Sequence, residues 1–170
     1  DAGVVHFITK SPFSHPGTTV TISGGERSFF SGEFRHAGVS GNGKLGYKVT
    51  GTYGQANDWE LDPDDDADAA QIAIDGVRDT DYTKTNVNGN LEYRFSDTGT
   101  LTANAGYSAL TSTILSGVGT LQAEEYGYTY GQLRLNLDSF FAQVYLNKND
   151  AGKSRVYGAF PVIDNSTQLV

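Results

Sequence analysis

The chain has 170 residues, and its 12 Lys and Arg residues against 20 Asp and Glu residues give a formal net charge of −8 at pH 7. This balance argues against a nucleic-acid partner, because binding to a phosphate backbone needs an excess of basic side chains. The absence of cysteine excludes disulfides, thiolate metal ligands and cysteine nucleophiles. Glycine (21 residues) and aromatic residues (12%) are abundant, which favours a β-rich fold.

A compact β-rich run opens the chain at residues 3–10 and stops at Ser11-Pro12. Residues 11–17 contain two prolines and a glycine, which is typical of a linker. We therefore expect a boundary near residue 12, with residues 13–17 as a linker and residues 18–170 as the main domain.

Seven later segments alternate apolar and polar residues with a period of two, the pattern of strands whose two faces meet different environments. With their flanking residues, strands of this kind approach the 9–11 residues of a tilted membrane span. In chain order they lie at residues 18–22, 30–35, 47–53, 87–95, 101–107, 132–137 and 142–147. They predict an all-β, antiparallel sheet.

Helical periodicity is confined to residues 67–77, where Gly76 is expected to end the helix. Past Lys44 the connections alternate in length. Residues 96–99 and 138–139 are short, whereas the long connections are residues 56–82, residues 111–125 and the stretch after residue 148. Short turns at one end of a sheet and long loops at the other are typical of outer-membrane barrels.

A soluble antiparallel sandwich or barrel also has alternating strands and is the main alternative. Two features favour a membrane barrel. The polar faces are rich in Asn, Gln, Arg and Glu, and aromatic residues near strand ends suit an interfacial girdle: Tyr53, Tyr93, Phe95 and Phe140. We therefore expect part of an up-and-down transmembrane β-barrel, because about seven strands are too few to close one.

Residues 3–12, Gly-Val-Val-His-Phe-Ile-Thr-Lys-Ser-Pro, closely resemble the G-V-[IV]-N-I-I-T-K segment that ends the plug domain of TonB-dependent outer-membrane receptors. The hairpin around residues 24–27, the Gly-Tyr-Lys-Val at residues 46–49 and residues 142–152 also resemble this family. The resemblance implies that residues 1–12 are the last plug strand and that residues 18–170 begin a larger barrel. We accordingly expect the chain to be a fragment.

The same resemblance implies a function in active transport across the bacterial outer membrane. Such receptors bind a scarce ligand outside the cell, most commonly a ferric siderophore, and import it with energy from the TonB complex. The implied partners are therefore TonB, the ligand and the lipid membrane. A passive porin or small structural barrel is one alternative, and a soluble β-sandwich that acts as a binding module is another.

Aromatic and polar residues in the long loops and near the external strand ends are the candidates for ligand contact. Stacking and hydroxyl hydrogen bonds suit catecholate, heterocyclic or sugar ligands, although some of these rings also suit an interfacial girdle. The candidates are Trp59, Tyr82, Tyr126, Tyr128, Tyr130, Arg134 and Tyr145. Tyr128 and Tyr130 share the parity of Gln132 and Arg134, so we expect them to face the lumen.

An acidic run offers carboxylates with the spacing of an EF-hand loop, at Asp64, Asp66, Asp68 and Asp75. Position 6 of such a loop would be Ala69 instead of glycine, and a solvated acidic loop is the alternative. A calcium site in this loop is the only cofactor hypothesis.

Two nucleotide-binding patterns overlap at residues 38–46, but both need a helix to follow and a strand follows instead. No catalytic motif is present, and the three histidines are scattered. We therefore expect a protein that is not an enzyme.

Overall fold

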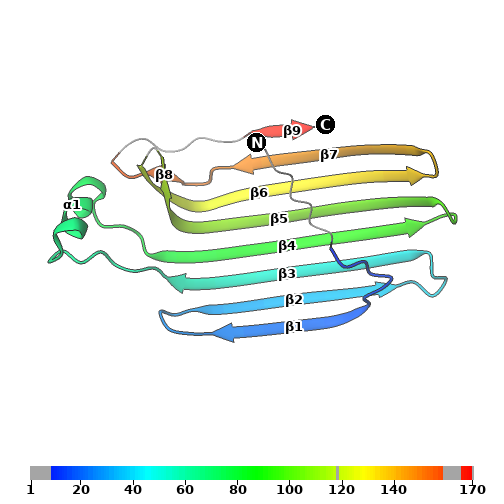
Figure 1. The fold of residues 1–170 in the computed structure, drawn as a ribbon, viewed down its shortest axis with the longest axis horizontal. Coiled ribbons are helices and arrows are strands. Elements are labelled where there is room, and N and C mark those ends of the chain that lie inside the picture. The colour runs from blue at the N-terminus through cyan, green and yellow to red at the C-terminus, as the bar shows by residue number, and fades with distance from the viewer. Residues whose placement is uncertain (1–8, 118, 159–165, 170) are drawn as a thin grey trace.

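The computed structural model describes residues 9–117, 119–158 and 166–169. These residues form one antiparallel sheet and one short helix, α1 (Asp66–Asp75), between the third and fourth strands (Figure 1). The strands are β1 (Gly17–Gly24), β2 (Phe30–Val39), β3 (Leu45–Asn57), β4 (Asp81–Arg94), β5 (Gly99–Ser116), β6 (Gly119–Leu137), β7 (Phe140–Asp150), β8 (Arg155–Val156) and β9 (Thr167–Leu169).

No helix in the described part of the chain has the length and apolar character needed to cross a membrane.

The sheet confirms the predicted all-β, antiparallel architecture. Strands β1 to β7 lie side by side in chain order, β9 pairs with β7, and β8 pairs with β6. The seven long strands match the seven alternating segments of the sequence. Within the described residues the sheet does not close on itself, so β1 and β9 are its two edges.

The connections confirm in part the predicted asymmetry between the two ends of the sheet, because the long connection between β3 and β4 is present, whereas β5 ends at Ser116 and β6 begins at Gly119. The turns β2–β3, β4–β5 and β6–β7 lie at one end, where the last of them consists of residues 138–139 (Figure 1). The α1 loop, which we define as residues 58–80 between β3 and β4, lies at the other end together with β8. We call this second end the loop end.

One predicted loop is wrong. Residues 111–125 mostly continue β5 and β6, so these strands reach 18 and 19 residues. The prediction fails because the hairpin contains a bulge. The pairing shifts between Leu110 and Ser112, and Glu125 adopts a φ of 55°. A bulge puts the alternation of the outer segment out of phase with the rest of its strand, which hides that segment from a period-two search.

Helix α1 confirms the predicted helix within two residues at either end. Asp65 caps its N-terminus, and its side chain accepts hydrogen bonds from the backbone N–H groups of Ala67 and Asp68. Gly76, with a φ of 75°, ends it as predicted. The acidic first turn also suits the positive end of the helix dipole.

The two faces of the sheet differ as the alternation predicts. Val87 and Leu91 in β4 leave 49% and 51% of their surface exposed, whereas the intervening Asn88 and Asn90 are half-buried. The same holds for β3, β6 and β7, whose exposed apolar residues include Val49, Leu133 and Val144. We call these two sides the apolar face and the polar face.

Apart from glycines, the buried residues of the described ranges are few and lie in two places. Pro12, Ala37 and Thr102 are buried on or beside the N-terminal segment of residues 9–15, which crosses the polar face (Figure 1). A second group lies at the loop end and consists of Thr120, Gln122, Ala123, Ala151 and Ser154. The predicted plug strand at residues 3–10 falls outside the described residues except for Thr9 and Lys10, which are not in a strand.

Candidate functional site

Amide side chains form a row across the middle of the polar face. Asn90, Asn104 and Gln132 are direct cross-strand partners on β4, β5 and β6. Asn90 Nδ2 donates to Asn104 Oδ1 at 2.6 Å, and Asn104 Nδ2 donates to Gln132 Oε1 at 3.0 Å. Opposite side chains in a sheet lie close enough for such bonds, which fix the orientation of each amide.

Tyr130 reaches across β5 because its partner there is a glycine. Asn88, Gly106 and Tyr130 are direct cross-strand partners, and the Tyr130 hydroxyl donates to Asn88 Oδ1 at 2.8 Å. A Cβ at Gly106 would collide with Asn88 Oδ1 and with the Tyr130 ring. The Tyr128 ring lies next to this pair, with its centroid 6.2 Å from that of Tyr130.

The N-terminal segment binds to the polar face mainly through backbone groups. Lys48 Nζ donates to Thr9 Oγ1 at 3.0 Å and to the Lys10 carbonyl at 2.9 Å. Further along the segment, Arg35 Nη2 donates to the His15 carbonyl at 2.5 Å. The segment is therefore held by cations that project from β2 and β3.

One ring contact and one glycine complete this docking. Arg94 Cζ lies 3.6 Å from the centroid of the Phe13 ring, a cation–π geometry. Gly46 makes room underneath, because a Cβ at this position would collide with Phe13 and Pro12. The predicted linker at residues 13–17 is thus seated on the sheet until β1 begins at Gly17.

A polar cleft of about 570 Å³ remains between the N-terminal segment and the sheet. Its cations are Lys10, Lys48 and Arg134, and its one carboxylate, Glu92, pairs with Arg94 at 2.9 Å. Arg134 Nε is buried and has no hydrogen-bond partner among the described residues. The cleft is lined by Thr9, Lys10, Ser11, Pro12, Lys48, Asn90, Glu92, Thr102, Asn104, Tyr130, Gln132 and Arg134.

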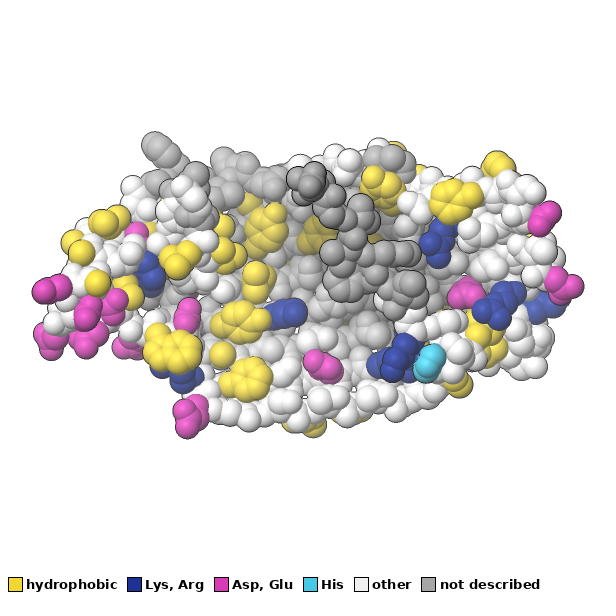
Figure 2. Space-filling model, in the orientation of Figure 1, with side chains coloured by type: hydrophobic (Ala, Val, Ile, Leu, Met, Phe, Trp, Pro, Cys, Tyr) yellow, Lys and Arg dark blue, Asp and Glu magenta, His cyan; other side chains and the backbone are white. Residues whose placement is uncertain are grey.

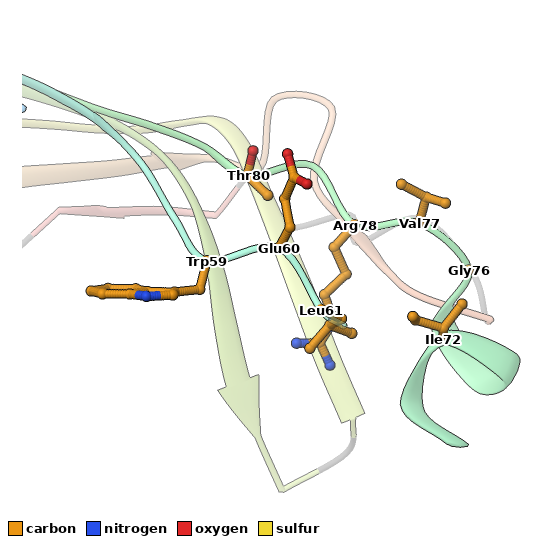
Figure 3. Close-up of a pocket in the computed structure, with 8 residues that line it drawn as sticks. All are labelled: Trp59, Glu60, Leu61, Ile72, Gly76, Val77, Arg78 and Thr80. Atoms are coloured by element: carbon orange, nitrogen blue, oxygen red, sulfur yellow. The ribbon is translucent and has the colours of Figure 1, made fainter. Parts of the chain in front are cut away.

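A smaller cavity of about 160 Å³ lies in the α1 loop (Figure 3). Its lining combines apolar side chains with one guanidinium, one carboxylate and one hydroxyl: Trp59, Glu60, Leu61, Ile72, Gly76, Val77, Arg78 and Thr80. Figure 3 shows the Trp59 ring pointing away from Val77. Arg27 Cζ lies 4.4 Å from the centroid of the Trp59 ring, whose residue is 75% exposed.

The α1 loop concentrates the negative charge of the chain. Residues 58–80 hold nine of the 20 Asp and Glu residues but one of the 12 Lys and Arg residues. Figure 2 shows acidic side chains gathered at the end of the molecule that carries α1. This end therefore attracts cations and repels anions at long range.

The four carboxylates of the calcium hypothesis are not brought together. Asp66 and Asp68 lie in the first turn of α1, and Asp75 at its other end pairs with Arg78 at 2.8 Å. Within the described ranges no three His, Asp or Glu side chains are arranged to hold a metal ion. The helix replaces the open loop that EF-hand coordination requires.

The predicted ligand residues fall into two groups. Tyr82, Tyr126, Tyr128, Tyr130, Arg134 and Tyr145 share the parity of the polar face on β4, β6 and β7, and Tyr130 and Arg134 line the same cleft. Trp59 lies apart from them in the α1 loop. Sequence reasoning missed Gly106 and Lys48, although both share the parity of Asn88 and Asn90 across the ladder.

No protein-family model, curated protein or solved structure matches this chain.

Proposed function

We propose that this chain is part of an outer-membrane active-transport receptor. In this proposal the apolar face meets lipid, the polar face lines a lumen, and the loop end faces outward. A scarce ligand, most commonly a ferric siderophore for receptors of this kind, binds outside and is imported with TonB-coupled energy. The TonB-dependent character rests on the sequence resemblance of residues 3–12.

The exposed apolar face supports a membrane location. Its residues include Val20 at 61% exposure and Ile22 at 71%, on strands that are not covered by a second layer among the described residues. Exposed apolar area on this scale needs a partner, because single soluble domains rarely leave such patches in water. In a soluble sandwich a second sheet would cover this face.

The N-terminal segment on the polar face is the observation that carries the proposal. Lys48, Arg35 and Arg94 hold residues 9–15 against the wall that would face the lumen. A plug inside a barrel requires such a contact, whereas a passive porin has a water-filled lumen. The polar cleft beside this segment supplies amides, a tyrosine hydroxyl and cations for a polar solute.

Bilayer conductance of the protein produced from its natural gene separates the three functions. We expect insertion without steady conductance, because the lumen is occupied. Steady conductance of the intact protein would contradict the receptor and support a porin, and failure to insert would support a soluble module. Uptake of radio-iron siderophores by cells that lack their own receptors should then require TonB, and uptake without TonB would contradict the energised step.

A further inference from the structure

The α1 loop is attached to the rest of the loop end by polar bonds. Helix α1 buries no apolar residue, and its Ile74 is 69% exposed. The bonds to β5, β6 and the segment after β8 come from residues 75–79, which are the last residue of the helix and the four that follow it. Arg27 of the β1–β2 turn separately contacts the start of the loop, through the Asp58 carbonyl and the Trp59 ring. We call residues 75–79 the latch segment.

Asp75 and Arg78 make the first set of bonds. Arg78 donates to Asp75 Oδ2 from Nε at 3.1 Å and from Nη2 at 2.8 Å, and Gln71 Nε2 donates to the same oxygen at 2.8 Å. Thr120 on β6 bonds both partners, since its hydroxyl accepts from Arg78 Nη2 at 3.1 Å and hydrogen-bonds the Asp75 carboxylate. The Asp75 side chain is 3% exposed and that of Arg78 is 16% exposed.

Asp79 makes the second set through its backbone. Its N–H donates to the Tyr157 hydroxyl at 2.8 Å, and its carbonyl oxygen lies 3.0 Å from Thr113 Oγ1. Both hydroxyls also lie at bonding distance from Gln122 Oε1, Tyr157 at 2.9 Å and Thr113 at 3.0 Å. Gln122 is fully buried, so its amide fixes the position of both hydroxyls.

We propose that residues 75–79 act as a polar latch that fixes α1 to the β5–β6 hairpin and releases the helix as one unit when the Asp75–Arg78–Thr120 bonds break. Water replaces each of these hydrogen bonds on opening, so the net contribution of each bond to the attachment is much smaller than its strength in isolation. An attachment made of such bonds opens locally without unfolding the sheet. The cap of helix α1 at Asp65 does not involve the latch segment, so we expect the helix to stay folded when the latch opens.

These contacts exist whatever surrounds the apolar face, so the latch and the proposed transport function stand or fall separately. The chain has no cysteine, so single and paired cysteines can be introduced for labelling without background. Ala70 on α1 and Leu115 on β5 are both exposed and suit a pair of spin labels across the latch.

The test compares Asp75→Asn and Tyr157→Phe with Asp64→Asn in the spin-labelled protein. Asp75→Asn weakens the pairing with Arg78, and Tyr157→Phe removes the acceptor of the Asp79 N–H. Asp64→Asn is the matched control, because it makes the same charge change in the same loop at a carboxylate that accepts no hydrogen bond among the described residues.

We expect the first two variants to broaden the distance distribution between labels and to raise amide exchange at Asp79 about tenfold or more, while exchange in β4 stays unchanged. The control should match the parent protein. Unchanged distances and exchange in both latch variants would overturn the proposal. A rise in exchange throughout the sheet would overturn it too, because these residues would then stabilise the whole fold.

Discussion

Gly106 shows how one missing side chain organises the polar face. It lies between Asn88 and Tyr130 in the ladder, and the Tyr130 ring occupies the space that a Cβ would need. An aromatic ring that covers a strand glycine shields the backbone and gains contact area. The sequence pattern places Tyr130 on the polar face but does not reveal its partner, because the partner depends on the register of three strands.

Gly106→Ala should destabilise the folded protein by about 1–3 kcal/mol, since the added methyl group forces Tyr130 off Asn88. Urea unfolding in detergent measures the change. Gly89→Ala is the control, because a Cβ at this position, one residue beyond Asn88 on β4, has no atom within 4 Å. Equal loss of stability in both variants would contradict the role assigned to Gly106.

Asp75 gives the latch a defined dependence on pH. Burial by itself raises the pKa of the Asp75 carboxyl, but hydrogen bonds from Arg78, Thr120 and Gln71, together with the charge of Arg78, leave the pKa below its ordinary value of 3.8. A carboxyl whose pKa is lowered by folding stabilises the folded form above its unfolded pKa. That contribution is lost as the pH falls through the folded pKa.

We therefore expect the distribution of distances between labels at residues 70 and 115 to stay constant from neutral pH down to about pH 4. It should broaden only in stronger acid. The charged group that faces Asp75 is Arg78, while Thr120 of β6 and Gln71 of α1 are neutral. Asp75→Asn should remove this acid step. Broadening of the same size in acid in the Asp75→Asn variant would show that another carboxyl causes it.

Helix α1 is the element that the sequence predicts best. Its acidic start, short apolar pattern and terminal glycine are local signals, so they do not depend on the rest of the fold. The β5–β6 hairpin is the opposite case. Its outer half pairs beyond a bulge, and no local pattern distinguishes it from a loop. The latch partners Thr113 and Gln122 lie in that half, which is why sequence reasoning did not place them in a site.

Asp65→Ala should weaken α1 by about 1 kcal/mol, because the side chain that accepts from the Ala67 and Asp68 N–H groups is lost. Amide exchange of residues 67 and 68 reports this change directly. Asp64→Ala, at the neighbouring position, should leave their exchange unaltered. Equal protection in the parent and in Asp65→Ala would show that the cap does not stabilise the helix.

At the scale of the whole molecule, the period of two predicts the two faces and the alternating connections predict the two ends. Both follow from local sequence, and the structure confirms the two faces and, of the predicted loops at residues 56–82 and 111–125, the first. The docking of residues 9–15 could not be predicted, because it depends on Gly46 and Lys48 meeting a segment more than 30 residues earlier in the chain. The environment of each face is the central claim of the proposed function.

Spin-label accessibility on β4 in the natural outer membrane tests that claim most directly. Labels at Val87→Cys and Leu91→Cys should be more accessible to oxygen, which partitions into lipid, than to a water-soluble nickel chelate. Labels at Asn88→Cys and Asn90→Cys should show low access to oxygen. An alternation of period two, with its oxygen maxima at residues 87 and 91, is the predicted result. Equal access of the nickel chelate to both faces would show that water surrounds the sheet and would contradict the membrane assignment.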